Sequence, residues 1–264
     1  IPSLAGDLYV GYRSTPVPYR RFVQLIAPLL VLSMVTTASL LSREQPAWGD
    51  GVWDTASAKT FEGTVQLVPY PMLTVVSVDG VESDAGPYLL VRPGKLGASA
   101  DAAPFDGSAV SVTGYLLERE GRRIIELDTA AEAPIVARAD AAVTLTQPAW
   151  SSPALVTFTG EILDSKCYIG AMKPGEGRGH KACAITCVSG GIPPMIVTLD
   201  ADGNRRYTLL TLASGEAITG SDLETMLPLI ADPTTVTGRS GALGDWGLLA
   251  IDPASGIARS PRVR

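Results

Sequence analysis

Residues 61–65 read FEGTV, and the same pattern returns at residues 158–162 as FTGEI. Three more short apolar blocks recur in the same order: YLLV at 88–91 returns as YTLL at 207–210, SVTG at 111–114 as TVTG at 235–238, and IIELD at 124–128 as LLAID at 248–252. Four blocks that keep their order indicate an internal repeat, and a repeat decides the fold class before any other feature does.

Each copy of the repeat reads as five strands with a connecting segment between the third and the fourth. The runs are short, alternating and rich in Val, Leu, Thr and Gly, which is typical of β-structure. In the second copy Ser221 and Glu224 form a capping-box pattern, which predicts a short helix before Pro228. This is the layout of an OB-type barrel. We therefore predict a mainly β protein with two tandem OB-like β-barrel domains, and the alternative is two generic β-sandwich halves.

The spacing of the blocks locates an insertion. The first blocks lie 97 positions apart (158 against 61), whereas the YLLV and YTLL blocks lie 119 apart (207 against 88). The second copy therefore holds 22 more residues between its first and third strands, the difference between 119 and 97.

The inserted region contains all three cysteines and the single histidine of the chain, at Cys167, His180, Cys183 and Cys187. If residues 180–187 form a helix, Cys183 and Cys187 share one face of it and His180 lies one turn earlier. Such a helix would present three ligand side chains together. Cys167 would complete a set of four after a glycine-rich stretch.

Three interpretations of this cluster are open. A Cys3His metal site, with zinc as the expected ion, suits tetrahedral thiolate and imidazole ligands, and a closed four-ligand site is structural. A disulfide from Cys167 to Cys183 or Cys187 is favoured by an extracytoplasmic location, whereas a Cys183–Cys187 bond within a helix would be strained. The third interpretation is a catalytic or redox Cys–His pair, for which the sequence names no orienting partner.

The run GEILDSKCYIGAMKPGEGRGHKACAITCVSGGIPP, residues 160–194, resembles a segment of uncharacterised bacterial membrane-anchored exported proteins. In these proteins Asp-x-x-Cys is followed by His-x-x-Cys-Ala-x-x-Cys and a Gly-x-Pro turn. The resemblance implies an association with membrane redox systems. It implies no particular activity and assigns no role to single residues.

An uncharged apolar segment near the N-terminus, residues 22–42, predicts one transmembrane helix. As a helix it spans about 31 Å, enough to cross a bilayer. Arg13, Arg20 and Arg21 precede it and acidic residues follow it, so the positive-inside rule places its N-terminal side in the cytoplasm. We predict an uncleaved signal anchor. The alternative, a cleaved signal peptide, lacks a clear cleavage site before Arg43. Because the first residue is Ile, we expect further residues upstream of it.

The composition excludes several classes of protein. The chain of 264 residues has 27 acidic and 21 basic side chains, a net charge of −6, which argues against a nucleic-acid binder. One histidine excludes any mechanism that needs two imidazoles, and three cysteines exclude a dense disulfide scaffold. A hydrophobic fraction of 46% excludes a disordered chain.

These observations predict the domain organisation. The expected parts are a cytoplasmic segment at 1–21, a transmembrane helix at 22–42, a stalk at 43–58, a first β-domain at 59–128, a linker at 129–155, and a second β-domain at 156–264 that carries the Cys/His insertion and a basic tail.

The expected function follows from this organisation. Residues 1–21 show little periodicity and cannot fold alone, so we expect a larger membrane assembly to order them. The sequence predicts a non-catalytic accessory subunit of a respiratory or photosynthetic electron-transfer complex in the bacterial inner membrane, with periplasmic β-domains. Its expected partners are the lipid bilayer and integral membrane subunits, and no nucleic acid. The alternative is a membrane-anchored periplasmic metal-binding or thiol redox protein that uses the Cys/His cluster.

Overall fold

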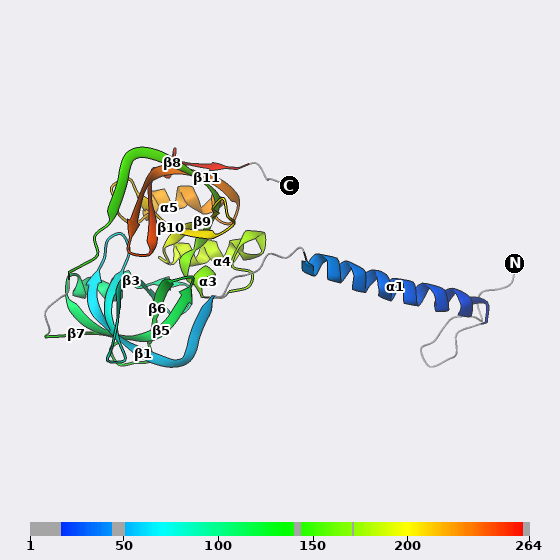
Figure 1. Ribbon diagram of the computed structural model, residues 1–264, viewed down its shortest axis with the longest axis horizontal. Coiled ribbons are helices and arrows are strands. Elements are labelled where there is room, and N and C mark those ends of the chain that lie inside the picture. The colour runs from blue at the N-terminus through cyan, green and yellow to red at the C-terminus, as the bar shows by residue number, and fades with distance from the viewer. Residues whose placement is uncertain (1–16, 44–50, 140–143, 171, 261–264) are drawn as a thin grey trace. The chain divides into compact units, whose positions relative to one another are not determined.

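A computed structural model of the chain describes residues 17–43, 51–139, 144–170 and 172–260 (Figure 1). The chain divides into two compact units, residues 1–48 and 49–264. Strands make up 45% of it, which confirms a mainly β protein. Most of the predicted cytoplasmic segment and the last four residues of the basic tail lie outside the described residues.

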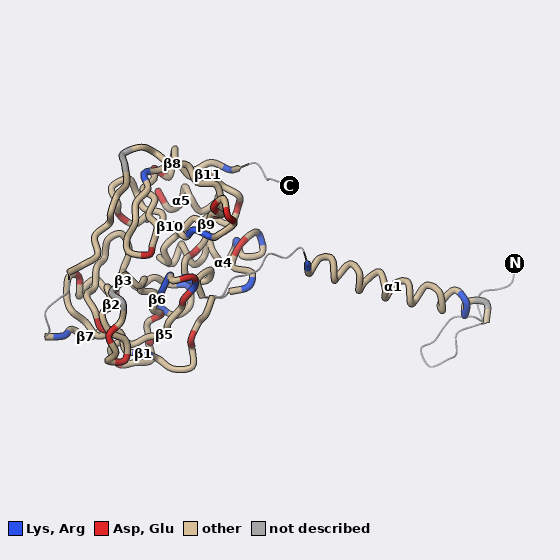
Figure 2. Tube along the Cα trace, in the orientation of Figure 1, with Lys and Arg blue, Asp and Glu red and all other residues tan. Residues whose placement is uncertain are grey.

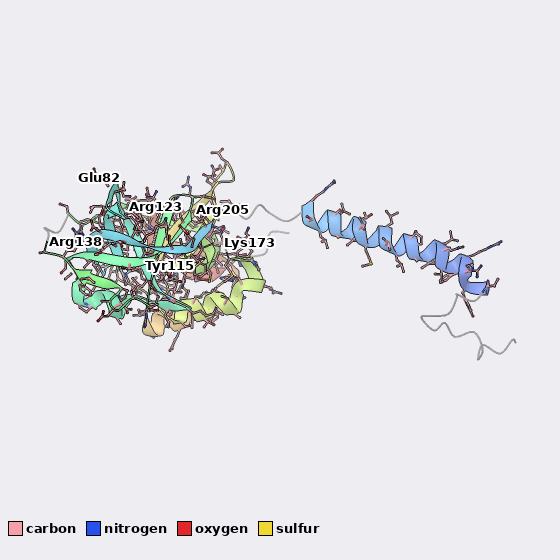
Figure 3. The ribbon with its side chains drawn as sticks, turned by 90° about the horizontal axis from the view of Figure 1, so that it is seen from below. Glu82, Tyr115, Arg123, Arg138, Lys173 and Arg205 are labelled. Carbon is pink, nitrogen blue, oxygen red and sulfur yellow. The ribbon has the colours of Figure 1, made fainter. Side chains whose placement is uncertain are left out.

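In the first unit the structure describes residues 17–43, which form the helix α1 (Val17–Arg43). Its segment Tyr19–Arg43 has a mean hydropathy of 2.0 and is nowhere buried. Basic residues lie only toward the two ends of α1, at Arg20, Arg21 and Arg43 (Figure 2), and side chains project from all sides of the helix (Figure 3). The helix is therefore long and apolar enough to span a membrane or to serve as a signal sequence.

The first barrel contains five strands in the order β1-β2-β3-β6-β5, and β5 pairs with β1 to close it. Their bounds are β1 Val52–Gln66, β2 Met72–Val78, β3 Val81–Arg92, β5 Ala109–Arg119 and β6 Arg122–Leu127. Smaller elements flank them: β4 Leu96–Gly97, α2 Ser99–Ala102, the 3-10 helix η2 Ala103–Phe105, and β7 Ile135–Ala137.

The second barrel repeats this arrangement in the order β8-β9-β10-β12-β11, and β11 pairs with β8 to close it. Its strands are β8 Ala149–Asp164, β9 Pro194–Leu199, β10 Arg205–Leu212, β11 Pro233–Leu243 and β12 Trp246–Ile251. Its other elements are α3 Ser165–Ile169, α4 Gly177–Ser189, α5 Gly220–Met226, the 3-10 helix η3 Leu227–Leu229, and β13 Ile257–Arg259.

The register between the first and the fourth strand supports the repeat at the predicted offsets. Thr60 pairs with Thr113 in the first barrel, and their counterparts at the predicted offsets, Thr157 and Thr237, pair in the second. Both barrels also join their third and fifth strands in parallel, β3 with β6 and β10 with β12. Each barrel has its helical connection between the third and the fourth strand, at α2 and at α5.

The predicted short helix before Pro228 is present as α5, but its start differs from the prediction. The residue that caps it is Thr219, in extended conformation, and no side chain supplies a capping hydrogen bond. Ser221 is therefore inside the helix, which begins at Gly220, two residues before the start that a cap at Ser221 predicts.

Two element boundaries also differ from the predicted domain limits. β1 begins at Val52, inside the predicted stalk, because Val52 already pairs with Glu118 of β5. The predicted linker contains β7, which pairs with β5, and the start of β8 at Ala149. Both stretches are ordered by pairing to a distant strand, which local composition does not reveal.

The glycine in the repeated block FxGx(V/I) is explained by the close approach of the next strand. A Cβ on Gly63 would lie 2.1 Å from the carbonyl oxygen of Thr74, and a Cβ on Gly160 would lie 2.0 Å from that of Val197. Only glycine fits at this point in either barrel.

The two barrels share a continuous hydrophobic core. One cluster of buried side chains includes Met72 and Leu117 of the first barrel together with Ile196 and Trp246 of the second. Trp246 donates a hydrogen bond from Nε1 to the carbonyl oxygen of Pro87, 3.2 Å away. The inserted helix α3 contacts β5 and β6 of the first barrel and β8 of the second, so the insertion lies at the junction of the barrels (Figure 1).

Candidate metal centre

The inserted residues form the two short helices α3 and α4. They lie between β8 and β9, the first and second strands of the second barrel, where the first barrel has only residues 67–71. The predicted position of the insertion is thereby confirmed. α3 supplies Cys167, and α4 supplies the other three candidate ligands.

Asp164 determines where α3 begins. It is the last residue of β8 and the N-cap of α3, and its Oδ1 accepts a hydrogen bond from the backbone N–H of Cys167 at 2.8 Å. An aspartate at this position satisfies a backbone donor that the first turn leaves free. The cap therefore fixes the backbone of Cys167 at the end of a barrel strand.

α4 presents His180, Cys183 and Cys187 at intervals of three and four residues, which places them on neighbouring turns of one side of the helix. His180 and Cys187 are buried, whereas Cys183 is half-buried. The predicted helix across residues 180–187 is present, and it brings these side chains to Cys167 of α3.

The three sulfur atoms lie close together without a disulfide. The Sγ atom of Cys167 is 3.9 Å from that of Cys183 and 3.7 Å from that of Cys187, and all three cysteines are free. Two sulfurs on the same tetrahedral ion are about 3.8 Å apart when each metal–sulfur bond is about 2.3 Å. The observed separations thus equal the edge of such a tetrahedron.

Ligand atoms of His180 and of Asp164 lie near these sulfurs. One ligand atom each of Cys167, His180 and Cys183 lie within 4.8 Å of one another, and so do those of Asp164, Cys167 and Cys187. Cys167 belongs to both groups and joins them. The cluster could therefore hold a metal ion.

His180 is held in place by Asp164. Its Nε2 lies 2.8 Å from Oδ2 of Asp164, and both side chains are almost fully buried. Histidines that bind metals commonly bond a carboxylate through the second ring nitrogen, which fixes the tautomer and the ring orientation. This contact leaves Nδ1 as the ring nitrogen free for a metal.

The first barrel reaches the cluster through residues 92–97, the turn between β3 and β4, which we call the 92–97 hairpin. Lys95 Nζ donates to Sγ of Cys183 at 2.7 Å and lies 3.8 Å from Sγ of Cys187. The backbone N–H of Gly97 donates to the carbonyl oxygen of Gly190, just after α4, at 2.9 Å. The cluster is therefore built from both barrels.

Lys166, next to Cys167, makes a second connection to the first barrel. Its buried ammonium donates to the carbonyl oxygens of Arg92 and Gly94 at 2.7 and 2.8 Å and pairs with the carboxylate of Glu126. The ring of Trp53 lies 5.6 Å from the same ammonium. These contacts hold α3 against the 92–97 hairpin.

The thiols have different proton affinities. A hydrogen bond with the Cys187 sulfur raises the pKa of the Cys167 thiol, and burial adds to the rise. The same hydrogen bond lowers the pKa of Cys187, and the positive charge of Lys95 lowers it further. Cys187 therefore loses its proton more readily than Cys167 does.

A cavity of about 300 Å³ opens beside the cluster. Its wall includes Cys167 and Cys183, the thioether side chain of Met172, and the side chains of Trp53 and Lys95. Two of the three thiols are thus reachable from outside, whereas Cys187 and His180 do not line the cavity.

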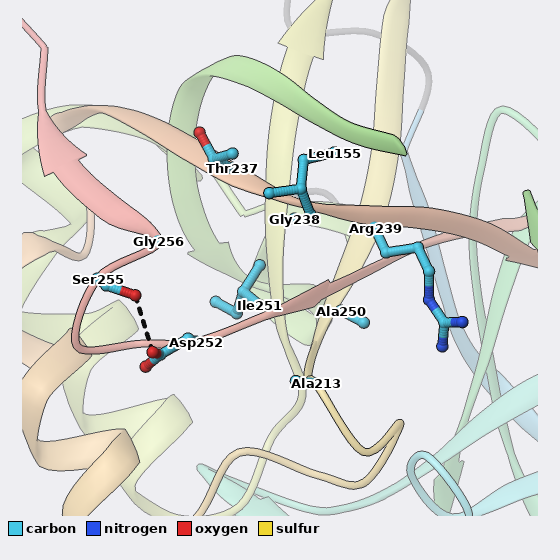
Figure 4. A pocket seen from close by; sticks show the side chains of 10 residues that line it. All are labelled: Leu155, Ala213, Thr237, Gly238, Arg239, Ala250, Ile251, Asp252, Ser255 and Gly256. Carbon is cyan, nitrogen blue, oxygen red and sulfur yellow. Dashed lines mark hydrogen bonds between the residues drawn. The ribbon is translucent and has the colours of Figure 1, made fainter. Parts of the chain in front are cut away.

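A second cavity, of about 310 Å³, lies on the second barrel (Figure 4). The hydroxyl of Ser255 donates to Asp252 at 2.8 Å within it, and the guanidinium of Arg239 lies over the ring of Trp150, 4.6 Å from its centre. Its polar groups are therefore engaged with one another or with the surrounding wall. None of its ten lining residues is a cysteine or a histidine.

Comparisons with known proteins add no assignment. No protein-family model, no curated protein and no solved structure matches this chain.

Sequence reasoning found the four residues of the insertion but missed their neighbours. Asp164 could have been found, since an aspartate at a strand end three residues before Cys167 fits an N-cap. Lys95 could not, because it lies in the other barrel and 72 positions before Cys167 (167 against 95), in a stretch without a distinctive motif.

Proposed function

We propose that this chain is a membrane-anchored, non-catalytic accessory protein whose outer part binds one metal ion at the junction of its two barrels. The observation that carries the proposal is the convergence of three sulfurs, with separations of 3.7 and 3.9 Å, beside a buried imidazole. The role of the ion is to hold α3 and α4 against the 92–97 hairpin, and we call this arrangement the metal clasp.

Zinc is the ion that the ligand set favours. Three thiolates and one imidazole form a common tetrahedral environment for Zn²⁺. The net charge of Zn²⁺ with three thiolates is minus one, and the Lys95 ammonium beside Cys183 balances it. Because Asp164 already orients His180, we assign Cys167, His180, Cys183 and Cys187 as ligands and Asp164 as the residue that positions the imidazole.

The barrels support an accessory role. We assign both to the OB type from their strand order and from the helix between the third and fourth strands. With α1 in the bacterial inner membrane and its N-terminus in the cytoplasm, the barrels face the periplasm, where they are placed to bind the outer surface of a respiratory or photosynthetic complex. The supporting observations are the arginines at the start of α1 and the resemblance of residues 160–194 to exported proteins associated with redox systems.

Elemental analysis of the full chain, purified from membranes in detergent, tests the proposal. We expect one zinc ion per chain and three thiols that react with a thiol reagent only after a chelator removes the metal. Cys187→Ser should lose the metal, while Ser189→Ala, two residues further along α4, should retain it. A metal-free native chain would overturn the proposal.

A thiol redox function is the second candidate. It is favoured by the lowered pKa of Cys187 and by the contact of its sulfur with that of Cys167. The same experiment separates the two functions. A redox protein would contain no metal and would lose two thiols on mild oxidation, with recovery on reduction.

A further inference from the structure

The cavity beside the metal clasp contains a second set of sulfur ligands. Cys167, Cys183 and Met172 line the same cavity, and the side chain of Met172 is 41% exposed. His180 and Cys187, which complete the proposed zinc set, are buried and do not line it. The sulfurs of Cys167 and Cys183 therefore belong to two sets of ligands. The inner set adds the imidazole of His180 and the thiolate of Cys187. The outer set adds the thioether of Met172.

The chemistry of the outer set differs from that of the inner set. Thioether and thiolate ligands are soft and suit Cu⁺, whereas a thioether is not among the usual protein ligands of Zn²⁺. Zn²⁺ prefers the nitrogen and thiolate ligands of the inner set. The two sets thus distinguish between two ions.

The charges near the cavity also favour Cu⁺. Lys95 extends over Cys183, with its Nζ 2.7 Å from the sulfur, and it also lines the cavity. The charges of one Cu⁺, two thiolates and one ammonium cancel, whereas Zn²⁺ on the same two thiolates would leave one positive charge uncompensated. Lys166, the other basic residue in the wall, is already neutralised by Glu126 and adds no net charge.

The cavity also provides access. A volume of about 300 Å³ is roughly ten times the share of one water molecule in the liquid, so an ion and the donor group that delivers it fit together. Cys167 and Cys183 both line this opening.

We propose that this cavity is a Cu⁺-binding site made of Cys167, Cys183 and Met172, with Lys95 as the balancing charge. Binding releases the protons of the two thiols to solvent and changes no oxidation state. The inference rests on the proposed function, because it uses two sulfurs of the metal clasp.

Competition for metal in the full chain tests it. The detergent-purified chain is first freed of metal, then titrated anaerobically with Cu⁺ or Zn²⁺ against a chromogenic chelator. Met172→Leu should weaken Cu⁺ binding about tenfold or more and leave Zn²⁺ binding unchanged. His180→Asn, which keeps a donor for Asp164, should weaken Zn²⁺ binding and leave Cu⁺ binding unchanged. Met34→Leu, at an exposed methionine of α1, is the matched control.

X-ray absorption at the copper edge gives an independent measurement. We expect a shell of sulfur atoms only, and its sulfur count should fall in Met172→Leu. Imidazole scattering around copper, or equal effects of Met172→Leu on the two metals, would overturn the inference while the metal clasp stands. A native chain that holds neither ion would overturn the metal clasp as well.

Discussion

At the scale of a single residue, Asp164 contacts both helices of the cluster, α3 at Cys167 and α4 at His180. One carboxylate oxygen accepts the backbone N–H of Cys167 and the other contacts Nε2 of His180, each at 2.8 Å. The residue is completely buried, so both contacts are shielded from water. Asp164 therefore fixes both the backbone of Cys167 and the imidazole of His180.

We expect Asp164→Asn to lower the affinity for zinc by about ten- to a hundredfold, the usual effect of losing a carboxylate behind a histidine ligand. The fold should survive, because the amide oxygen can still cap α3. Chelator competition measures the affinity, and circular dichroism checks the fold. An unchanged affinity in a folded variant would show that His180 is not a ligand.

A substitution of Lys166 tests the buried ion pair that this residue forms with Glu126 beside the cluster. Its side chain and that of Glu126 are 3% and 10% exposed, so removing one charge leaves the other buried without a partner. We expect Lys166→Met to lower the free energy of unfolding by about 3–5 kcal/mol. The double variant Lys166→Met/Glu126→Gln should recover part of the loss.

Urea denaturation measures both variants. If the single and the double variant lose the same stability, the ion pair does not contribute as the structure indicates. The metal should be removed beforehand, so that the measured difference contains no contribution from metal binding.

Residue types and spacing were sufficient to predict which side chains form the cluster. The scarcity of cysteine and histidine made Cys167, His180, Cys183 and Cys187 stand out, and a helix was expected to align the last three. Asp164 and Lys95 were not predicted, because their types are common and their contacts are tertiary. The sequence also left a disulfide open, whereas the three thiols are free in the structure.

At the scale of elements, the end of α4 packs closely against the 92–97 hairpin because residue 190 is a glycine. A Cβ on Gly190 would lie 1.8 Å from the carbonyl oxygen of Lys95, so any side chain there would push the two elements apart. Gly97 N–H, which bonds the carbonyl oxygen of Gly190, would move with them.

We therefore expect Gly190→Ala to destabilise the unit of residues 49–264 by about 1–3 kcal/mol and to weaken metal binding, because the hairpin carries Lys95. Gly179→Ala is the matched control within α4. Its Cβ would meet only Pro174, at 3.3 Å, and alanine favours a helix. Thermal unfolding with and without chelator measures both. Equal behaviour of the two variants would contradict the close contact.

Strands were predicted best where the same sequence block occurs in both copies of the repeat. The blocks at 61–65 and 158–162 lie on matching strands, because both barrels need the same alternation of side chains along the strand and a glycine at the same position. β7 was missed because three residues at its position carry too little pattern, and the early start of β1 was missed because Val52 is ordered by Glu118, far along the chain.

At the scale of the whole molecule, α1 and the double barrel belong to separate units. We expect Leu30→Arg in α1 to reduce the fraction of chain that resists alkaline extraction from membranes, since an arginine at the centre of a span costs about 2.5–3.5 kcal/mol. Leu199→Arg, at an exposed leucine of β9, is the control and should not change that fraction.

Extraction followed by immunoblotting measures both variants. A mature chain that lacks α1 would contradict the anchor and indicate a cleaved signal sequence. If the chain is anchored, partner subunits should co-purify with the tagged full chain, and they should be missing from membranes that lack it.

The central claim is that a metal ion at the Cys/His cluster holds the insertion of the second barrel against the 92–97 hairpin of the first. Hydrogen–deuterium exchange of the Gly97 amide tests it most directly, because that amide bonds Gly190 across the junction. We predict slow exchange in the metal-loaded chain and faster exchange after a chelator removes the metal or in Cys167→Ser. The amide of Leu90, bonded to Pro71 within the first barrel, should not change. Equal exchange of Gly97 with and without metal would contradict the claim.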